Sequence, residues 1–313
     1  MGLNSAASIL LVSLIILFII LSLETIKLGF CNDDHNVGCI DIERKALLKF
    51  KQGLEDSLDR LSSWVGKDCC KWSGVGCNNI TGRVNKLDLC NRFWSDDDGA
   101  IVVNVISGEI NPSLLYLDLN NDLFQTDLDS LGDPNETDLD GLGDPIETDL
   151  QWLATLSSLK YLNLGGVDLT KAASYWLPTI NMLPSLVELH LPSCGLSILP
   201  LTLPSINFTS LLVLDLSHNY FTSTIPPWLF NLKSMRYLKL SYNSFQGSIP
   251  KSIGNLTSLE KFYLTRNQMS GIIPESLGEL SSLVSLYIYG NTWEGAITEA
   301  HFLKHFLGFQ PKF

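Results

Sequence analysis

The feature that most constrains the fold is a segment that returns every 24 residues. LLVLDLSHNYFTSTIP begins at Leu211, MRYLKLSYNSFQGSIP at Met235 and LEKFYLTRNQMSGIIP at Leu259, and another copy begins at Leu283. Leu, Asn and Pro keep their places while most other residues change. Looser copies begin at Leu186, Leu159, Leu114 and Val84. This self-similarity predicts a repeat protein whose units stack, because no single unit can bury its own apolar side.

The template L-x-x-L-x-L-x-x-N is the signature of leucine-rich repeats. Its last two leucines are two residues apart, so they point to the same side of a strand and form the core. The sequence therefore predicts a leucine-rich-repeat solenoid of the α/β horseshoe type, with a parallel sheet on the concave face and about eight coils over residues 84–297. The third, fifth and seventh template positions are expected to face outward.

The template asparagines follow each strand, where the backbone loses its ladder partners. A buried amide both donates and accepts hydrogen bonds, so it satisfies the backbone of its own coil and of the next one. The predicted ladder consists of Asn219, Asn243, Asn267 and Asn291, and Cys194 occupies the same register.

Outward positions of consecutive coils carry tyrosine and cationic side chains, the types enriched in binding hot spots. The candidate ligand-binding residues are Tyr237, Lys239, Lys261, Tyr263, Thr265, Tyr287 and Tyr289, with Arg266 at a strand end. Strand surfaces favour tyrosine in any case, so a purely structural role for these residues stays open.

The N-terminus is typical of an export signal, predicted over residues 1–30. Ile9–Leu23 is an apolar run of 15 residues, which suits a signal peptide better than a spanning helix of about 20 residues. An uncleaved anchor remains an alternative, and no later stretch is long and apolar enough to span a membrane. Export implies an oxidising compartment, and four glycosylation sequons agree with it: Asn79, Asn135, Asn207 and Asn255.

Residues 31–83 are predicted to form a cysteine-rich cap over the first coil. A helix is expected there, because apolar residues recur at helical spacing at Ile42, Ala46, Leu47, Phe50 and Leu54. Trp64 and Trp72 are expected to pack within this cap.

The cap closely resembles that of plant leucine-rich-repeat receptors in ERKALLKFKQGL, LSSW, DCCKWSGVGC and GRVNKLDL. The segment that begins SSLKYLNLGGVDL resembles receptor-like proteins related to the ethylene-inducing xylanase receptor. The resemblance implies disulfides Cys39–Cys69 and Cys70–Cys77, which leaves Cys31 and Cys90 over. It also implies a cell-surface immune receptor with an extracellular array, one membrane span and no kinase of its own, which binds a microbial protein or peptide and signals through a kinase-bearing co-receptor.

Two segments depart from that family. The tail 298–313 abandons the template, and no second cap or membrane span follows, so we expect an uncovered last coil and a truncated chain. A tail that covers the last coil in place of a cap remains the alternative. Residues 125–151 form an insertion in which LDSLGDPNETD is followed at once by LDGLGDPIETD. Its Asp127–Asp149 stretch carries nine carboxylates and no Lys or Arg. A duplicated acidic surface loop is favoured over a calcium site, because Asp-Pro interrupts the alternate carboxylates that a calcium loop needs.

Neither enzymatic nor nucleic-acid-binding function is predicted. The net charge is −12, whereas phosphate binding needs a basic face. No catalytic motif, metal pair or phosphate-binding loop is present, so no metal or cofactor is expected and the chain is interpreted as a binding protein. A secreted cell-wall inhibitor of the polygalacturonase-inhibitor type, and a decoy or nonfunctional fragment, remain alternatives.

Overall fold

The computed structural model describes residues 38–52, 54–56, 59–89, 101–103, 114–120, 150–302 and 310–312. The chain divides into two compact units, Met1–Gly38 and Cys39–Phe313, and nearly all described residues belong to the second. Several predictions fall outside the described residues: the signal segment, Cys31, Cys90, Asn135 and nearly all of the acidic insertion. Among the described residues, no helix is long and apolar enough to cross a membrane.

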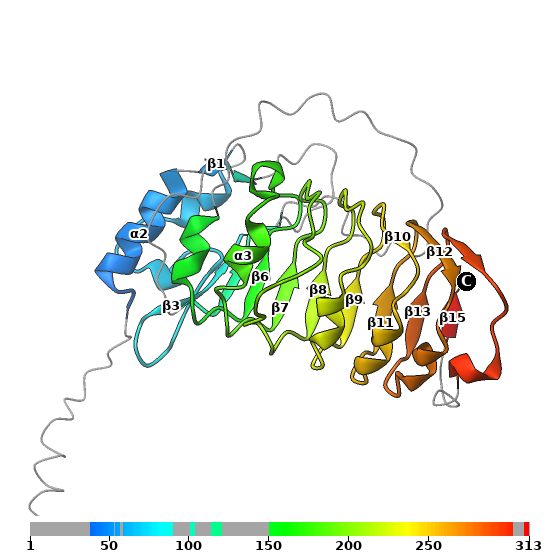
Figure 1. Cartoon of the computed structure of the whole chain (residues 1–313). Helices are drawn as coiled ribbons and strands as arrows, with labels where there is room; N and C mark the ends of the chain where they lie inside the picture. The colour runs from blue at the N-terminus through cyan, green and yellow to red at the C-terminus, as the bar shows by residue number, and fades with distance from the viewer. Residues whose placement is uncertain are drawn as a thin grey trace, which may run out of the picture. The chain divides into compact units, whose positions relative to one another are not determined.

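A long parallel sheet occupies the positions that the template predicts (Figure 1). Its strands are β3 (Val84–Asp88), β5 (Tyr116–Asp118), β6 (Tyr161–Asn163), β7 (Glu188–His190), β8 (Val213–Asp215), β9 (Tyr237–Lys239), β11 (Lys261–Tyr263) and β13 (Ser285–Tyr287). Each of these eight strands pairs in parallel with the one named after it. The middle residue of each triplet is buried, as in Leu162, Leu238 and Phe262. These observations confirm the leucine-rich-repeat solenoid.

The return segments contain short 3-10 turns in place of regular α-helices. They are η4 (Gln151–Thr155), η5 (Thr170–Ala172), η6 (Pro227–Asn231), η7 (Lys251–Asn255) and η8 (Glu275–Glu279), with one short helix, α3 (Trp176–Ile180). Pro226, Pro250 and Pro274 come directly before η6, η7 and η8, where a fixed φ helps the chain enter the turn. A second parallel sheet flanks these turns, formed by β10 (Gln246–Gly247), β12 (Gln268–Ile272) and β14 (Thr292–Glu294).

The predicted cap helix is present as α2 (Asp41–Gln52), but the residues that it buries differ from the prediction. Leu47 and Phe50 are buried as expected, whereas Ile42 is 78% exposed and Glu43 is buried. Glu43 is buried because its carboxylate accepts a hydrogen bond of 2.6 Å from the backbone N–H of Val84, at the start of β3. The helix therefore orients an acceptor toward the first coil at the cost of exposing an isoleucine.

The rest of the cap consists of short elements. They are β1 (Leu54–Asp56) with its antiparallel partner β4 (Ile101–Val103), the turns η1 (Arg60–Ser63) and η2 (Cys69–Lys71), and β2 (Val75–Cys77), which pairs antiparallel with β3. Trp64 and Trp72 are buried and stacked, with ring centroids 5.3 Å apart, and each indole N–H donates to a backbone carbonyl. This confirms that both pack within the cap.

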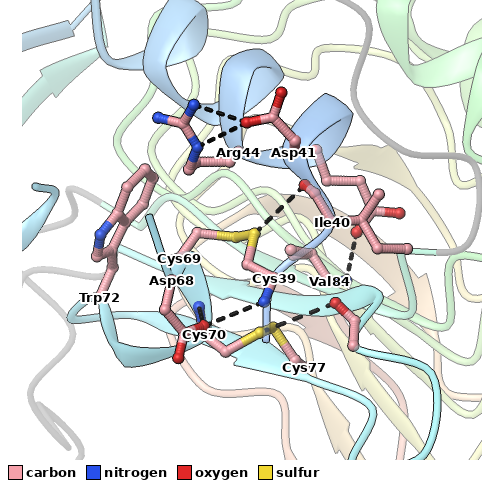
Figure 2. Close-up of a disulfide and its surroundings, with 12 residues drawn as sticks. Cys39, Ile40, Asp41, Arg44, Asp68, Cys69, Cys70, Trp72, Cys77 and Val84 are labelled. Carbon is pink, nitrogen blue, oxygen red and sulfur yellow. Dashed lines mark hydrogen bonds and ion pairs between the residues drawn. A yellow bond between two sulfur atoms is a disulfide. The ribbon is translucent and has the colours of Figure 1, made fainter. Parts of the chain in front are cut away.

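Both expected disulfides are present, Cys39–Cys69 and Cys70–Cys77 (Figure 2). Asp68 lies beside both, and its Oδ1 accepts hydrogen bonds from the backbone N–H groups of Cys39 and Cys70 at 3.1 and 3.2 Å. The bond from Cys39 is the main reason why the pKa of Asp68 is lowered. One carboxylate thus ties the two bridges together.

The tail packs on the last coil, although the sequence predicted that this coil would be uncovered. The turn η9 (Glu299–Phe302) packs against η8, and β15 (Gln310–Lys312) pairs in parallel with β13. His301 in η9 is buried, and its Nε2 lies 2.9 Å from the carbonyl oxygen of Ile273. The expectation of an uncovered last coil is therefore wrong, because backbone pairing extends the sheet without the template leucines.

The asparagine ladder is present in all four predicted coils. The Asn243 Nδ2 donates to the carbonyl of Leu216 in the preceding coil at 3.0 Å and to Leu240 and Ser241 in its own coil, each at 3.2 Å. Its Oδ1 accepts from the N–H of Phe221 at 3.2 Å. Equivalent bonds are made by Asn219, Asn267 and Asn291.

Cys194 occupies the ladder slot one coil earlier. Its buried thiol lies 3.1 and 3.3 Å from the carbonyl oxygens of Leu164 and Pro192. It therefore contacts the carbonyls that the slot presents, but with a weaker donor than an amide.

Candidate ligand-binding surface

The concave face is the outward side of the long sheet, where the first and third residues of each strand triplet form two rows. Strand register places Tyr237, Lys261 and Ser285 side by side in one row. Lys239, Tyr263 and Tyr287 form the other row. Parallel strands are about 4.8 Å apart, so side chains on neighbouring coils are in contact range.

The C-terminal part of this face carries the tyrosine–lysine patch, which we define as Tyr237, Lys239, Lys261, Tyr263 and Tyr287. Tyr263 and Tyr287 stack with ring centroids 4.6 Å apart. The Nζ of Lys261 lies 5.4 Å from the Tyr237 ring centroid, and that of Lys239 lies 5.9 Å from the Tyr263 ring centroid. The sheet thus brings these five predicted residues together as one surface of rings and cations.

Two ion pairs border the tyrosine–lysine patch. Lys239 pairs with the buried carboxylate of Asp215 at 3.1 Å. The Nε of Arg236 donates to Glu260 Oε1 at 2.7 Å, and this bond lowers the pKa of Glu260. Both Arg236 and the Glu260 carboxylate are accessible to solvent, so the pair is screened and contributes little to stability.

The prediction that Thr265 lies on the ligand-binding surface is wrong. It is only 3% exposed, and its backbone N–H and its hydroxyl both donate to Ser241 Oγ, at 3.1 and 2.9 Å. The alternation of side chains would place it outward, but β11 ends at Tyr263. The turn that follows stacks Thr265 on the equivalent serine of the preceding coil. Tyr289 is half-buried, and Arg266 is exposed.

A third row of side chains was predicted only in part: Arg266 was among the candidates, whereas His218 and Tyr242 were not. His218, Tyr242 and Arg266 each precede a ladder asparagine and have φ between 50° and 56°, in the left-handed region. Their shared backbone conformation aligns them: the His218 and Tyr242 rings stack at 4.2 Å, and the Arg266 guanidinium carbon lies 5.6 Å from the Tyr242 ring centroid. Their constant place before the asparagine was the signal available in the sequence.

The N-terminal part of the concave face carries a second polar group, the Asp118 cluster, made of Tyr116, Asp118 and Tyr161. The tyrosine rings stack at 4.2 Å, and both hydroxyls donate to Asp118 Oδ2, at 3.1 and 3.3 Å. Burial raises the pKa of the Asp118 carboxyl. Burial also raises the pKa of Tyr161, to about 12, so both phenols stay protonated donors at neutral pH.

Other charged residues surround the Asp118 cluster. Lys86 pairs with Asp88 at 3.1 Å, and its Nζ lies 4.5 Å from the Tyr116 ring centroid. Glu188 lies 3.4 Å from the Nε2 of His190, an interaction that lowers the pKa of Glu188. This end of the face is therefore acidic, with most of its carboxylates in contact with polar neighbours.

Comparison with known proteins agrees with this architecture. The leucine rich repeat N-terminal domain matches residues 41–78, and the leucine rich repeat matches residues 210–232, 234–256 and 258–280. Over 255 residues the chain is 34% identical to the receptor-like protein EIX1 of Solanum lycopersicum, an alignment that covers 68% of this chain and 24% of EIX1. The chain is a leucine-rich-repeat protein, and over about two thirds of its length it is similar to plant receptor-like proteins. It spans about a quarter of the length of the curated relatives it matches.

Two solved structures are also similar to this chain. A plant ice-binding protein is 26% identical with a TM-score of 0.52, over 83% of this chain and 66% of the other. The ectodomain of the Arabidopsis receptor kinase HAESA, solved with an extended IDA peptide hormone, is 24% identical with a TM-score of 0.53, over 84% of this chain and 44% of the other. The latter likeness shows the fold.

Three of the predicted glycosylation sites lie in the described part of the chain, and all three are exposed: Asn79, Asn207 and Asn255. The Asn207 Nδ2 donates to the carbonyl of Asn181 at 3.1 Å. An amide nitrogen that carries a glycan keeps one hydrogen, so this bond and glycosylation are compatible.

In the described part of the chain, one group of potential metal ligands converges, namely Cys39, Cys69 and Cys70. All three are disulfide-bonded, and metal coordination needs thiolates. The arrangement of rings and cations on the concave face is instead suited to binding another molecule.

Proposed function

We propose that this chain is the extracellular recognition module of a plant immune receptor-like protein. It binds a microbial protein or peptide elicitor, or a co-receptor, through the concave face and catalyses no reaction itself. The signal passes to a kinase-bearing co-receptor, and the site of action is the cell surface or apoplast, reached through the secretory pathway. The observation that carries this proposal is the tyrosine–lysine patch on three consecutive coils.

The construction of the tyrosine–lysine patch supports a binding role. Its residues project from strands whose middle residues, Leu238, Phe262 and Leu286, are fully buried. A rigid scaffold lowers the entropy cost of binding, and tyrosine offers a large contact area for few rotatable bonds. None of the five patch residues is needed to fill the core, so their identities are available for recognition.

The proposal is tested with a display library of random 12-residue peptides, selected on the whole secreted chain. The enriched peptides are then titrated against a variant in which Tyr237, Lys239, Tyr263 and Tyr287 are all changed to serine. We expect affinity to fall about thirtyfold or more, since loss of one anchor can cost about 2 kcal/mol. The matched control is Lys233→Ser/Lys251→Ser, which changes two exposed lysines outside the sheet.

Near-ultraviolet circular dichroism and the thermal midpoint establish that both variants are folded. Loss of the stacked tyrosine pair is expected to cost only about 0.5–1.5 kcal/mol. If no peptide is enriched, or if enriched peptides bind the four-residue variant as tightly as the parent, the concave face is not the recognition surface.

A further inference from the structure

We propose that the tyrosine–lysine patch is selective for a short acidic peptide segment, which lies in extended form across β9, β11 and β13. This inference rests on the proposed function and adds the chemistry of the ligand. It follows from three features of the concave face: the order of rings and cations, the charge on either side of β8, and the distance that the patch spans.

Rings and cations alternate across neighbouring strands. Tyr237 on β9 lies beside Lys261 on β11, and Lys239 on β9 lies beside Tyr263 on β11. Each lysine lies near a ring face, at 5.4 or 5.9 Å, which limits its motion. Lys239 is also paired with Asp215 at 3.1 Å, so Lys261 carries the more available charge. Lys261 is exposed and so presents its ammonium group to solvent. A carboxylate placed over the patch would meet the Lys261 ammonium group beside the Tyr237 ring.

The charge of the concave face changes sign along the sheet. From β8 to β13 the face and its border carry four cations and two carboxylates, a net charge of +2: Arg236, Lys239, Lys261 and Arg266 against Asp215 and Glu260. Counted in the same way over the described residues from β3 to β7, two lysines face three carboxylates, a net charge of −1 with histidine neutral: Lys86 and Lys160 against Asp88, Asp118 and Glu188. Charge complementarity therefore favours an acidic ligand at the C-terminal part alone.

The same change of sign limits the length of the acidic segment. Three adjacent strands span two intervals of about 4.8 Å, or about 10 Å, which matches about three residues of extended chain. A run that is several residues longer would reach Glu188 on β7, and then the Asp118 cluster on β6 and β5, and be repelled. The net charge of −12 on the whole chain also disfavours a nucleic acid or another long polyanion. A peptide with a few clustered Asp or Glu residues fits both limits.

The test uses the enriched 12-residue peptides and copies in which every Asp and Glu is replaced by Asn and Gln. We expect enrichment of clustered acidic residues and affinity about tenfold or more lower for the amide copies. Raising NaCl from about 50 to about 300 mM should weaken only the acidic peptides, because salt screens exposed charges. Lys239→Ser/Lys261→Ser should remove the preference, whereas Lys233→Ser/Lys251→Ser should retain it.

A second variant keeps the test decisive if the double variant misfolds. Lys261→Glu alters one exposed side chain, and it should reverse the preference so that the amide copies bind tighter than the acidic peptides. Equal binding of acidic and amide copies to the parent chain would overturn the acidic selectivity. If those peptides still lose affinity for the four-serine variant, the concave face remains the recognition surface and only this inference fails.

Discussion

Tyr161 and Tyr263 occupy neighbouring rows of the same sheet, yet their surroundings differ. In the N-terminal part, the Tyr161 hydroxyl is directed at Asp118, a carboxylate only 5% exposed. In the C-terminal part, the Tyr263 ring stacks on Tyr287 and lies near the Lys239 ammonium group. One end of the face thus satisfies its polar groups internally, while the other presents rings and cations outward. Identical strand geometry supports either use, so side-chain identity decides which coils can bind a ligand.

The two parts also differ beneath the surface. The four C-terminal ladder slots hold asparagines, whereas the coils before them hold Val167 and Cys194, both buried. In the Cys194 coil a backbone bond replaces one amide bond, since the N–H of Leu169 donates to the Cys194 carbonyl at 2.8 Å. The amide ladder is therefore strongest under the proposed recognition surface, where rigidity benefits binding.

The largest expected effect comes from the cap. Replacing Cys39 and Cys69 with alanine opens a loop with a sequence separation of 30 and should lower the free energy of unfolding by about 3–4 kcal/mol. Because repeats contact only their neighbours, amide hydrogen exchange should accelerate more at Leu117 than at Leu286. Denaturant unfolding and exchange measured by mass spectrometry check both points.

The control for that prediction is the second bridge. Cys70 and Cys77 are only seven residues apart, so their replacement with alanine should cost less, about 2 kcal/mol. Uniform acceleration of exchange across all coils would show that the two parts of the sheet unfold as one unit.

The asparagine ladder gives the next largest effect. Asn243→Leu removes the donor for three backbone carbonyls and should lower the free energy of unfolding by about 1–3 kcal/mol, although it adds an apolar side chain. Cys194→Ala in the N-terminal part should cost about 1 kcal/mol or less, since a thiol is a weak donor. Thermal midpoints of the two secreted variants make the comparison, and equal losses would refute the distinction between the slots.

Much of this architecture was predictable from the sequence, because it repeats. The last four strands, the four asparagines and the prolines before η6, η7 and η8 each follow from a residue that recurs every 24 residues. The first four strands follow from looser copies of the template. The disulfide pairing came from resemblance to a family. Thr265 was placed wrongly, because alternation describes a strand and this residue lies beyond the end of one.

The Asp118 cluster could not be predicted, for a different reason. Tyr116 and Tyr161 are 45 residues apart, with the irregular insertion between them, so the 24-residue period does not indicate that they are neighbours. The burial of Glu43 was missed because helical periodicity identifies only apolar residues as buried. It does not anticipate a carboxylate that is buried to satisfy a backbone N–H.

The smallest expected effect is a pH dependence that separates the acidic end from the rest. Burial raises the pKa of Asp118, so the folded chain retains this proton to a higher pH than the unfolded chain, whose Asp titrates near about 3.9. The stability that this group contributes is full below that value and is lost as pH rises through the folded pKa. Asp118→Asn keeps an oxygen acceptor for both tyrosine hydroxyls but cannot ionise, so it should flatten the decline in unfolding free energy above about pH 4.

Asp68 in the cap serves as the control, because its pKa is shifted in the opposite direction from that of Asp118. Its pKa is lowered, chiefly by the hydrogen bond from the Cys39 N–H, so its contribution is present above the unfolded pKa and is lost as pH falls. Asp68→Asn should therefore flatten the acid side of the same profile and leave the decline above about pH 4 unchanged. Urea unfolding of both variants from pH 3 to pH 7 distinguishes the two. If Asp118→Asn leaves the slope above pH 4 as steep as in the parent, the carboxylate ionises freely in the folded chain. The cluster would then be as open to solvent as the tyrosine–lysine patch, and the contrast between the two ends of the face would not hold.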